Sequence, residues 1–458
     1  MDYPAWIIGG VGPGWMIGLI ATFHVLISHF AVGGGIFLPF TEAWARKNDR
    51  KDVLVFLKDF SRFFLILTNV FGAISGIGIW FIIGLISPQA TASLIRLFGF
   101  VWGLEWGVFL VEIVTLIFYY YGWEKMDPKL HMKLGWLYAA TSFLSLFTIN
   151  GIITFMLTPG KWQQTHNIGD AFFNPGFWPA LVVRTLICIT LAGIYATFVI
   201  SKMDENSRFR KELLAYTTAW LLPSYLLLVG AFIWYYSVLP QPVMENLMSG
   251  FVGSQPASGV LNLNMVARIA FLGVIVSMTV GLAFFVSAYL NPREFNVWKS
   301  GLLLFTAAIL VTSFEYSREM LRKPYVIRDF MFSNGVTLKA TTDLPLNRSF
   351  TEQMRFKPEG SSVGEQMFIG QCMSCHTISG YRSLKKRLKG FDQAGIYNSI
   401  LLTMQKPPAE NRYHKVMPPV IGTPEELQAL SEYLYKAVNE PAKVASSEAA
   451  EPMADKQK

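Results

Sequence analysis

The sequence predicts an all-α fold, in which a polytopic bundle of about eight transmembrane helices is followed by one small water-soluble helical domain. Composition is the first reason, because the 458 residues are 52% hydrophobic and only 15% charged, as membrane proteins are. The second reason is that eight apolar segments each reach the roughly 20 residues that a bilayer crossing needs. The third is that this apolar character ends near residue 325.

The predicted spans follow one another with short connections. They are residues 14–37, 63–86, 97–121, 134–157, 177–200, 215–238, 265–290 and 298–321. The connections after the first, third and fifth spans are rich in lysine and arginine, whereas the alternate ones carry few basic residues. The positive-inside rule therefore places both chain termini outside the cytoplasm. The net charge of +8 serves this topology, so it does not indicate a nucleic-acid-binding protein.

Cys372-Met373-Ser374-Cys375-His376 is the strongest motif in the chain. Two thiols at this spacing can add to the vinyl groups of a haem, and the adjacent histidine can then bind the iron. A zinc half-site or a redox CxxC is the alternative, but both need partners, and the third cysteine, Cys188, lies in an apolar run. Met417 is the predicted sixth ligand, because a thioether opposite histidine is a usual pairing. Haem c is attached outside the cytoplasm, in agreement with the predicted topology.

These observations divide the chain into four parts. Residues 1–325 form the membrane domain, 326–362 a linker, 363–440 a class I cytochrome c domain and 441–458 a disordered tail. Residues 364–368 are expected to open the first helix of the cytochrome domain. Thr423-Pro424-Glu425-Glu426 is expected to cap its last helix. No cleavable signal peptide is evident at the start of the sequence.

Ionisable residues inside the predicted spans are candidates for function, because an unpaired charge in hydrocarbon is costly. They are His24, His29, Glu105, Glu112, Arg184, Arg268, Glu315, Arg318, Glu319 and Arg322. Most fall within about ten residues of the outer helix ends, or roughly 15 Å at helical rise. Such a layer suggests haems bound by His24 and a glutamate, with arginines beside their propionates. Glu105 and Glu112 are two turns apart on one helix face, so they could carry protons inward.

Other polar and small residues have simpler interpretations. His29, His131, His166 and His414 are expected to be structural or loop residues. Glu315, Arg318 and Arg322 could also be interfacial anchors. Gly33-Gly34-Gly35 lies inside the first span, so it predicts close helix packing and not a phosphate-binding loop.

The membrane domain resembles subunit I of the cytochrome bd oxidases over nearly all of residues 1–325, and the chain as a whole resembles the branch of that superfamily with a C-terminal cytochrome c. The resemblance rests on five motifs. They are Thr22-Phe23-His24, Glu105 with Glu112, His131-Met132, Asn150-Gly151 and Glu319-Met320-Leu321-Arg322-Lys323-Pro324-Tyr325.

The resemblance implies that His24 and Glu319 ligate two high-spin haems, one b-type and the other d-type or b-type. Glu105 and Glu112 would serve the oxygen-reducing pocket, where Glu105 is also a candidate iron ligand, and Arg322, Arg268 and Asn150 would support the haems. The chain departs from the family at Arg184 and Ala270, where a low-spin haem's histidine and methionine are expected. It also lacks the long quinol-binding loop after the sixth span.

The expected function is that of a terminal reductase in the bacterial cytoplasmic membrane, with its cytochrome domain on the periplasmic side. It would take electrons from a soluble or membrane cytochrome through haem c and reduce a small oxidant, which we expect to be oxygen, with nitric oxide as an alternative. The expected partners are a second membrane subunit similar to subunit II and membrane lipid. Two other functions stay open, a quinol-oxidising conduit that passes electrons outward through haem c and an anchor that docks the cytochrome in a larger respiratory complex.

Overall fold

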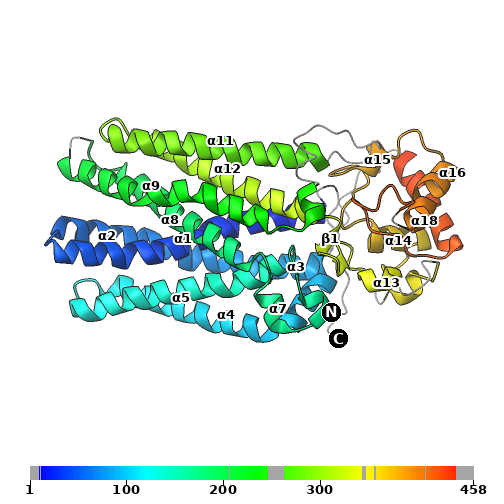
Figure 1. Cartoon of the computed structure of the whole chain (residues 1–458), viewed down its shortest axis with the longest axis horizontal. Helices are drawn as coiled ribbons and strands as arrows, with labels where there is room; N and C mark the ends of the chain where they lie inside the picture. The colour runs from blue at the N-terminus through cyan, green and yellow to red at the C-terminus, as the bar shows by residue number, and fades with distance from the viewer. Residues whose placement is uncertain are drawn as a thin grey trace, which may run out of the picture.

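A computed structural model of the chain describes residues 10, 12–205, 207–245, 263–342, 347–354, 357–407 and 409–439. Within these residues the chain forms a long helical bundle with a smaller helical domain at one end (Figure 1). The predicted tail, residues 441–458, lies outside the described part of the chain. The side chains of residues 263–271, which include Arg268 and Ala270, are also outside it.

Eight helical segments of the described chain are long and apolar enough to cross a membrane, which confirms the predicted number. One of them is a continuous run of α2 (Lys51–Leu65), the π-helical turn η1 (Ile66–Gly72) and α3 (Ala73–Ile86). The others are α1 (Pro13–Lys47), α4 (Pro88–Gly122), α5 (Pro128–Phe155), α8 (Phe177–Ile200), α9 (Arg208–Ser237), α11 (Leu263–Leu290) and α12 (Val297–Arg322). Two short helices, α6 (Trp162–Thr165) and α7 (Ile168–Phe172), connect α5 to α8.

Helix α1 lies at the centre of the bundle, and three consecutive glycines explain how its neighbours approach it. A Cβ atom at Gly33 would collide with the backbone of Cys188 on α8. At Gly34 it would collide with the ring of Phe64 on α2, and at Gly35 with that of Tyr138 on α5. Glycine therefore permits close contact on three sides of one helix. The structure confirms the packing role that the sequence predicted for this run.

The first two spans are longer than predicted at the ends away from the C-terminal domain (Figure 1). We name these the inner ends of the bundle, and the opposite ones the outer ends, because the positive-inside rule predicts that the former face the cytoplasm. Helix α1 continues ten residues past the expected end at residue 37, and α2 begins twelve residues before the expected start at residue 63. Both extensions are amphipathic: α2 buries Val53, Phe56, Leu57, Phe60 and Phe64 along one face and exposes its charged residues. Hydropathy alone ends a span where polar residues appear, but an amphipathic helix continues past that point.

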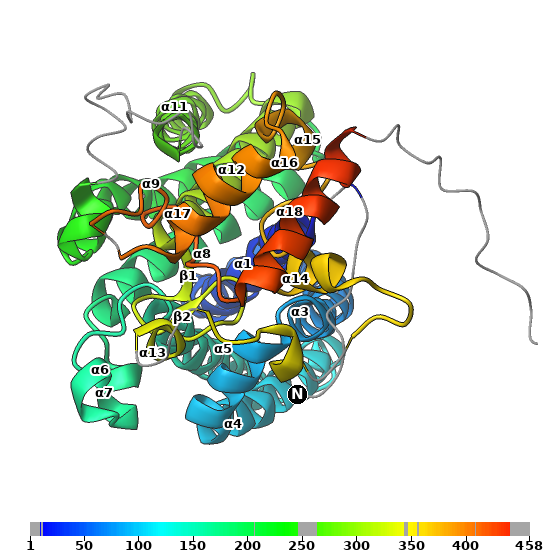
Figure 2. The ribbon, with the colours of Figure 1, turned by 90° about the vertical axis from the view of Figure 1, so that its right-hand side faces the viewer.

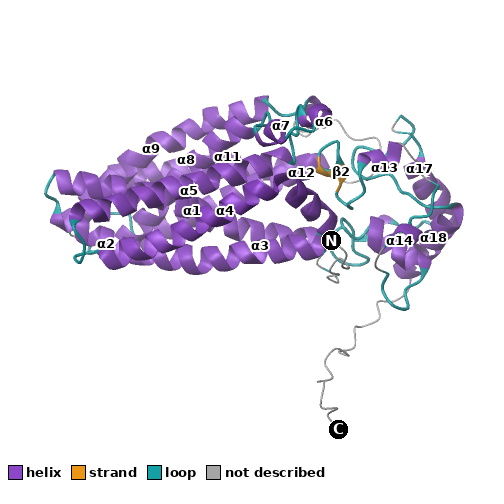
Figure 3. Ribbon diagram, turned by 90° about the horizontal axis from the view of Figure 1, so that it is seen from below, coloured by secondary structure: helices purple, strands orange, loops and turns teal. Residues whose placement is uncertain are grey.

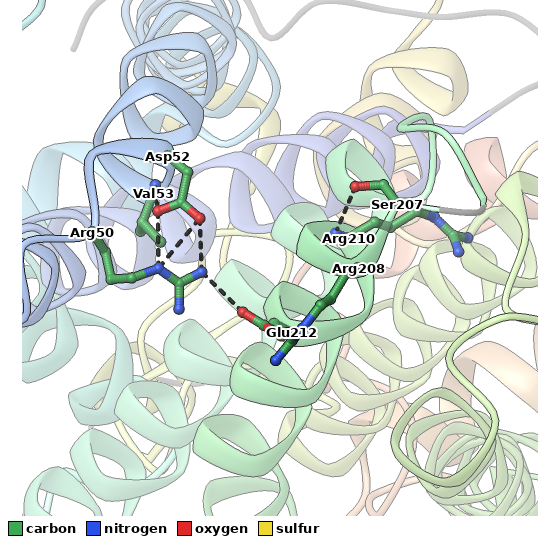
Figure 4. A network of polar contacts seen from close by, with 7 residues as sticks. All are labelled: Arg50, Asp52, Val53, Ser207, Arg208, Arg210 and Glu212. Carbon is green, nitrogen blue, oxygen red and sulfur yellow. Dashed lines mark hydrogen bonds and ion pairs between the residues drawn. The ribbon is translucent and has the colours of Figure 1, made fainter.

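Exposed ion pairs join these inner ends. Arg50 contacts Asp52 at 2.8 Å on α2 and Glu212 at 3.1 Å on α9 (Figure 4). Ser207 caps α9 by accepting a hydrogen bond from the backbone N–H of Arg210. Because the ion pairs are solvent-exposed, they contribute little free energy of folding, typically about 0–1 kcal/mol each.

A small β-hairpin follows α12 and is the only sheet among the described residues (Figure 3). Its strands, β1 (Tyr325–Ile327) and β2 (Met331–Phe332), pair antiparallel. Val326, Ile327 and Met331 pack in one cluster with Phe98 of α4 and Trp162 of α6. The first part of the predicted linker is therefore folded against the outer end of the bundle.

The C-terminal domain is built around the crossing of α14 (Val363–Gln371) and α18 (Pro424–Asn439). Gly364 lies at the crossing, where a Cβ atom would collide with the backbone of Ala429. Phe368 and Tyr433 pack beside it with ring centroids 5.6 Å apart. Shorter elements complete the domain; they are α13 (Leu338–Thr342), η2 (Thr351–Gln353), α15 (Leu384–Arg387), α16 (Gln393–Gly395), η3 (Ile396–Leu401) and α17 (Leu402–Gln405).

Glu426 confirms the predicted cap and also joins α18 to the preceding chain. Its carboxylate accepts the backbone N–H of Thr423 at 3.0 Å, while Thr423 accepts the N–H of Glu426 at 3.2 Å, which forms a capping box. The same carboxylate accepts the N–H groups of Phe350 and Thr351 at 2.9 and 2.8 Å. Burial alone would raise the pKa of Glu426, but hydrogen bonds led by that from the Thr351 hydroxyl hold it below its usual value.

We expect Glu426→Gln to destabilise the C-terminal domain by about 1–3 kcal/mol at pH 7, because an amide offers fewer acceptors to these donors. A native pKa below the unfolded value means that the carboxylate stabilises the fold fully above about pH 4.3. That stabilisation is lost as the pH falls through the lower native pKa. Hydrogen exchange of the α18 amides in the full chain measures both effects.

The exposed Glu432, which pairs with Lys436 on the same helix, provides the control, since Glu432→Gln should leave this exchange nearly unchanged. A difference between wild type and Glu426→Gln that persists undiminished at pH 2 would contradict the assignment.

Candidate functional site

Helix α12 carries buried ionic groups at its outer end. Glu315 contacts Arg318 at 2.9 Å on the same helix and Arg184 of α8 at 3.6 Å. One turn further, Glu319 pairs with Arg322 and, at 2.9 Å, with Lys323. Glu315, Arg184 and Arg322 are all buried. The structure thus brings Arg184 together with the α12 residues, as the common depth of these residues in the sequence predicted.

His29 belongs to the same group. Its Nδ1 lies 2.9 Å from the carbonyl oxygen of Val25, and its Nε2 lies 3.5 Å from a guanidinium nitrogen of Arg184. A carbonyl only accepts, so Nδ1 carries the proton and Nε2 faces the arginine with its lone pair. His29 is therefore part of a buried polar cluster with Arg184 and Glu315, a more specific environment than the structural role expected from the sequence.

His24 lies on α1 against α3, apart from the α12 residues. Its Nδ1 is 3.0 Å from the Ser75 hydroxyl, which itself donates to the carbonyl of Phe71 at 2.7 Å. The serine oxygen therefore accepts from Nδ1–H, which leaves the Nε2 lone pair available as a ligand. A Cβ atom at Gly76 would lie 3.2 Å from the ring, so glycine leaves room for the imidazole.

Glu105 and Glu112 lie on the face of α4 that contacts α5. Glu105 accepts a hydrogen bond from Ser145 of α5 at 3.3 Å, and the same hydroxyl interacts with Glu112. Oε1 of Glu112 is buried and has no hydrogen-bond partner among the described residues. The Tyr138 hydroxyl, which also interacts with Thr68, is close to Glu112. The predicted pair of carboxylates is thus connected by one serine, at the interface of two spanning helices.

Several buried polar atoms near the outer end lack acceptors or donors within the described chain. Asn150 donates to the carbonyl of Phe177 at 2.9 Å, but its Oδ1 is unpartnered. Arg184 Nε, Arg318 Nη1 and Arg322 Nε are likewise buried without a hydrogen-bond acceptor. Buried polar groups are normally hydrogen-bonded. These guanidinium groups therefore form a candidate site for an anionic group.

In the C-terminal domain, His376 is buried and oriented by one hydrogen bond. Its Nδ1 lies 3.0 Å from the carbonyl oxygen of Arg382, so Nδ1 is protonated and Nε2 is free to bind a metal. Burial lowers the pKa of His376 to about 4, and the imidazole is therefore neutral at pH 7. Cys372 and Met417 both pack against the core of the domain. Among the described residues, no group of three or more His, Cys, Asp or Glu is arranged to hold a metal ion.

The loop after this motif contacts the outer end of α1. The backbone N–H of Tyr381 donates to the carbonyl of Gly10 at 3.1 Å, and the Tyr381 ring meets Trp15 edge to face at 5.8 Å. Gly380 leaves space for Gly10, because a Cβ atom there would collide with the Gly10 backbone. The C-terminal domain consequently covers the end of the bundle, with α14 and α18 in front of α1 and α3 in Figure 2.

Among the described residues, no hydrogen bond or ion pair joins His24 to Glu105 or Glu319. The predicted ligands therefore form separate groups in the outer half of the bundle, each held by its own partner. Sequence analysis did not select four further residues at the helix interfaces: Tyr119 and Glu42 at the inner end of the bundle, and Tyr138 and Ser145 nearer its middle. The seven-residue spacing of Glu105, Glu112 and Tyr119 is the signal that could have identified the first of them.

Glu42 was overlooked because it lies five residues beyond the predicted end of the first span. Its carboxylate is fully buried and contacts Arg46, Tyr119 and His131. His131 of α5, expected to be structural or in a loop, is therefore a buried partner of an acidic residue of α1. His166 and His414 lie in turns, as expected.

We expect Glu315→Gln to destabilise the bundle by about 3–5 kcal/mol, because it leaves the buried Arg184 and Arg318 without their anion. Equilibrium denaturation of the purified protein in detergent measures the change. Glu294, exposed in the connection between α11 and α12, is the control, and Glu294→Gln should change stability by less than about 0.5 kcal/mol. Equal effects of the two substitutions would show that the ionic cluster does not support the fold.

Comparison with known proteins gives one family and one fold. The sequence model of the family described as "Cytochrome bd terminal oxidase subunit I" matches residues 14–243. The structure of bd oxidase from Geobacillus thermodenitrificans is similar with a TM-score of 0.58 and 16% sequence identity, over 70% of this chain and 90% of that chain. At this identity the likeness concerns the fold alone. No curated protein matches the sequence.

Proposed function

Because the chain belongs to the cytochrome bd terminal oxidase subunit I family, we propose that it is the haem-carrying subunit of a terminal reductase. In this proposal the enzyme takes electrons through a covalent haem c outside the membrane and reduces oxygen at a two-haem site in the bundle. The family is one of oxidoreductases, and the eight apolar helices are those of a multi-pass membrane protein. One observation supports electron entry through haem c: the same chain contains both this helical bundle and a CxxCH motif.

The residues of the C-terminal domain fit a haem c. Cys372 and Cys375 would bind its vinyl groups, and His376 has the tautomer that leaves Nε2 free for iron. Met417 packs against the same core as Cys372 and would supply a thioether ligand. When bound, haem supplies the one-electron chemistry of the reaction; the chain's contribution is to orient these ligands and keep them away from water.

The residues of the outer bundle fit two further haems, one b-type and the other d-type or b-type. His24 offers a free Nε2, and Glu319, although paired with two cations, keeps unused lone pairs on its carboxylate oxygens. Glu105 has one oxygen beyond its bond to Ser145 and is a third candidate ligand. The unpartnered guanidinium nitrogens of Arg184, Arg318 and Arg322 fit the negative charge of propionates. Asn150 and, on sequence grounds alone, Arg268 would support the same site.

Glu105 and Glu112 would move protons to this site through the Ser145 hydroxyl that lies between them. Glu112 suits the role because one of its oxygens is buried and has no hydrogen-bond partner among the described residues, so that oxygen can take a proton without first giving up a hydrogen bond. General acid–base groups must lie within hydrogen-bond reach of the proton that they transfer. Ser145 lies within that reach of Glu105, at 3.3 Å, and its hydroxyl also interacts with Glu112.

Arg184, which stands where the histidine of a low-spin haem is expected, is committed to Glu315 and His29, and its guanidinium has no acceptor atom to offer a metal. This commitment, with the short connection after the sixth span, favours a cytochrome over quinol as electron donor. We further propose a second membrane subunit, similar to subunit II, and a bacterial cytoplasmic membrane with the cytochrome domain outside. The exposed apolar side chains of α4, such as Phe100 and Leu110, would face lipid or that subunit.

The second candidate function is a quinol-oxidising conduit. This function is supported by the contact of the Tyr381 loop with the start of α1. Such a contact between the C-terminal domain and the bundle could carry electrons from the bundle to haem c as well as in the reverse direction. Oxygen uptake driven by reduced cytochrome c distinguishes a reductase from this conduit, in which added quinol would instead reduce cytochrome c. An anchor without chemistry would contain one haem per chain.

We expect the dithionite-reduced protein to show haem c together with high-spin haem whose spectrum shifts with carbon monoxide. His24→Ala should remove one non-covalent haem and leave haem c, because it deletes a ligand only in the membrane domain. Pyridine haemochrome analysis counts the haems. His166→Ala, which changes an exposed turn residue, is the control and should keep all of them; retention of every non-covalent haem in His24→Ala would exclude this ligand.

We expect Met417→Leu to keep haem c attached but to lower its reduction potential, because a thioether ligand raises the potential and leucine removes it at similar volume. Redox titration of the full protein measures the shift. Met404, buried in the same domain, provides the control as Met404→Leu. An unchanged potential in Met417→Leu would mean that another residue binds the iron.

A further inference from the structure

A run of basic residues follows the CxxCH motif in the C-terminal domain. We name it the basic segment and define it as Arg382, Lys385, Lys386, Arg387 and Lys389. The positions between them hold no acidic residue. The positive-inside rule accounts for basic residues in the connections at the inner end of the bundle, but not for a run of them at the outer end. The basic segment therefore needs another explanation.

The fold places the lysines of the basic segment together on the surface. Leu384 and Leu388 lie one helical turn apart, in and directly after α15, and both are buried in the core of the domain. Lys385, Lys386 and Lys389 occupy the positions next to these leucines, and all three are exposed. Because the leucines anchor one side of this short helix, its cationic side chains are presented on the other.

The positive charge of the basic segment is poorly balanced by nearby carboxylates. Lys386, Arg387 and Lys389 form no ion pair among the described residues. Burial and the neighbouring charge of Arg382 lower the pKa of Arg387. Asp392, the nearest acidic residue in the sequence, is committed to capping α16, where it accepts a backbone N–H at 2.7 Å. Like charges gathered in this way attract an anionic partner.

The basic segment begins at the level of the outer helix ends. Tyr381, which precedes Arg382, meets the Trp15 ring of α1 edge to face at 5.8 Å, and its hydroxyl interacts with that of Tyr316 on α12. Trp15 is 54% exposed and Tyr316 is 38% exposed. Exposed tryptophan and tyrosine near the ends of spanning helices are typical of the lipid headgroup region. The contact with Tyr381 thus brings the basic segment to that region.

Helix α15 continues from this contact beside the bundle. In Figure 1 it lies in the half of the C-terminal domain nearer to the bundle, and in Figure 2 it lies toward one edge, away from α5. Phe391 follows Lys389, and its side chain is 37% exposed. Lysines beside an exposed aromatic ring fit a lipid surface, because the charges attract headgroups and the ring can enter the interface. An acidic protein would match the charge, but lipid headgroups are always present at the level of the helix ends.

We propose that the basic segment binds the headgroups of anionic phospholipids at the outer end of the bundle. Phosphate oxygens would accept charge-assisted hydrogen bonds from the lysine and arginine side chains. This binding would hold the C-terminal domain against the membrane, next to the contact of Tyr381 with α1. It would also steady the loop that orients His376 through the carbonyl of Arg382. The inference does not depend on the proposed reductase function, because headgroup binding requires no turnover.

The test uses the full chain in phosphatidylcholine nanodiscs that contain a small share of phosphatidylglycerol with a photoactivatable headgroup. After illumination, peptide mass spectrometry locates the cross-links, which we expect within residues 382–391. The double variant Lys386→Gln/Lys389→Gln should reduce their yield at least about fivefold, because each basic residue near an anionic surface strengthens binding by about that factor. Salt at about 1 M should reduce it as well, since the Debye length falls to about 3 Å.

Lys406→Gln/Lys415→Gln is the matched control and should keep the wild-type yield, since both lysines are exposed in the same domain but lie outside the basic segment. Pyridine haemochrome analysis should give equal haem c in all variants, which shows that the domain is folded. Photoactivatable phosphatidylcholine supplies the baseline.

Equal cross-linking by the two lipids, or an unchanged yield in Lys386→Gln/Lys389→Gln, would overturn the proposal. So would a wild-type segment that cross-links to neither lipid while Lys386→Gln/Lys389→Gln slows the reduction of haem c by an acidic donor protein, because that protein would then be the partner. Headgroup cross-linking in a chain that reduces no oxygen would support this inference and refute only the proposed function.

Discussion

The cost of burying charge in an apolar bundle organises this molecule. A lone ion in hydrocarbon is unfavourable by several kcal/mol, so each buried ionic group needs a partner. Glu315 meets this need between Arg184 and Arg318, Glu319 between Arg322 and Lys323, and Glu42 between Arg46 and His131. The first two groups lie at the outer end and the third at the inner end. The helices are thereby joined by ionic contacts at both ends and by close apolar packing between them.

Helix α1 connects these features. Its three glycines bring α2, α5 and α8 close to its middle, while His24 and Glu42 project from its outer and inner halves. Its outer end supports the C-terminal domain, because Trp15 contacts the ring of Tyr381 in the loop that follows His376. A single helix therefore carries His24 of the outer site, contacts the C-terminal domain and carries the buried Glu42. Displacement of α1 would be expected to affect the outer site and the contacts of Glu42 together.

Much of the fold could be predicted from the sequence because it depends on local patterns. Apolar length predicted eight spans, and the Thr423-Pro424-Glu425-Glu426 sequence predicted the cap of α18. Hydropathy failed at the inner ends of α1 and α2, where amphipathic helix continues beyond the apolar run. For this reason Glu42, which lies in the extension of α1, was not selected as a candidate residue. The pairing of Arg184 with Glu315 could be expected only as a shared depth, since residues 131 positions apart carry no sequence signal of contact.

The sequence by itself determined which chemical groups are present and predicted at what depth each lies: a CxxCH motif after the last span, histidine and carboxylates near one end of the spans, and basic residues in the connections at the other end. Periodicity and length carry that information because helix geometry is local. Only the tertiary structure decided which side chains meet. In the folded chain Ser145 bonds to Glu105, and His131 bonds to Glu42. Nδ1 of His24 faces Ser75, and Nδ1 of His376 faces the carbonyl of Arg382. Such contacts depend on how helices rotate and approach one another, which is fixed by packing across the whole bundle.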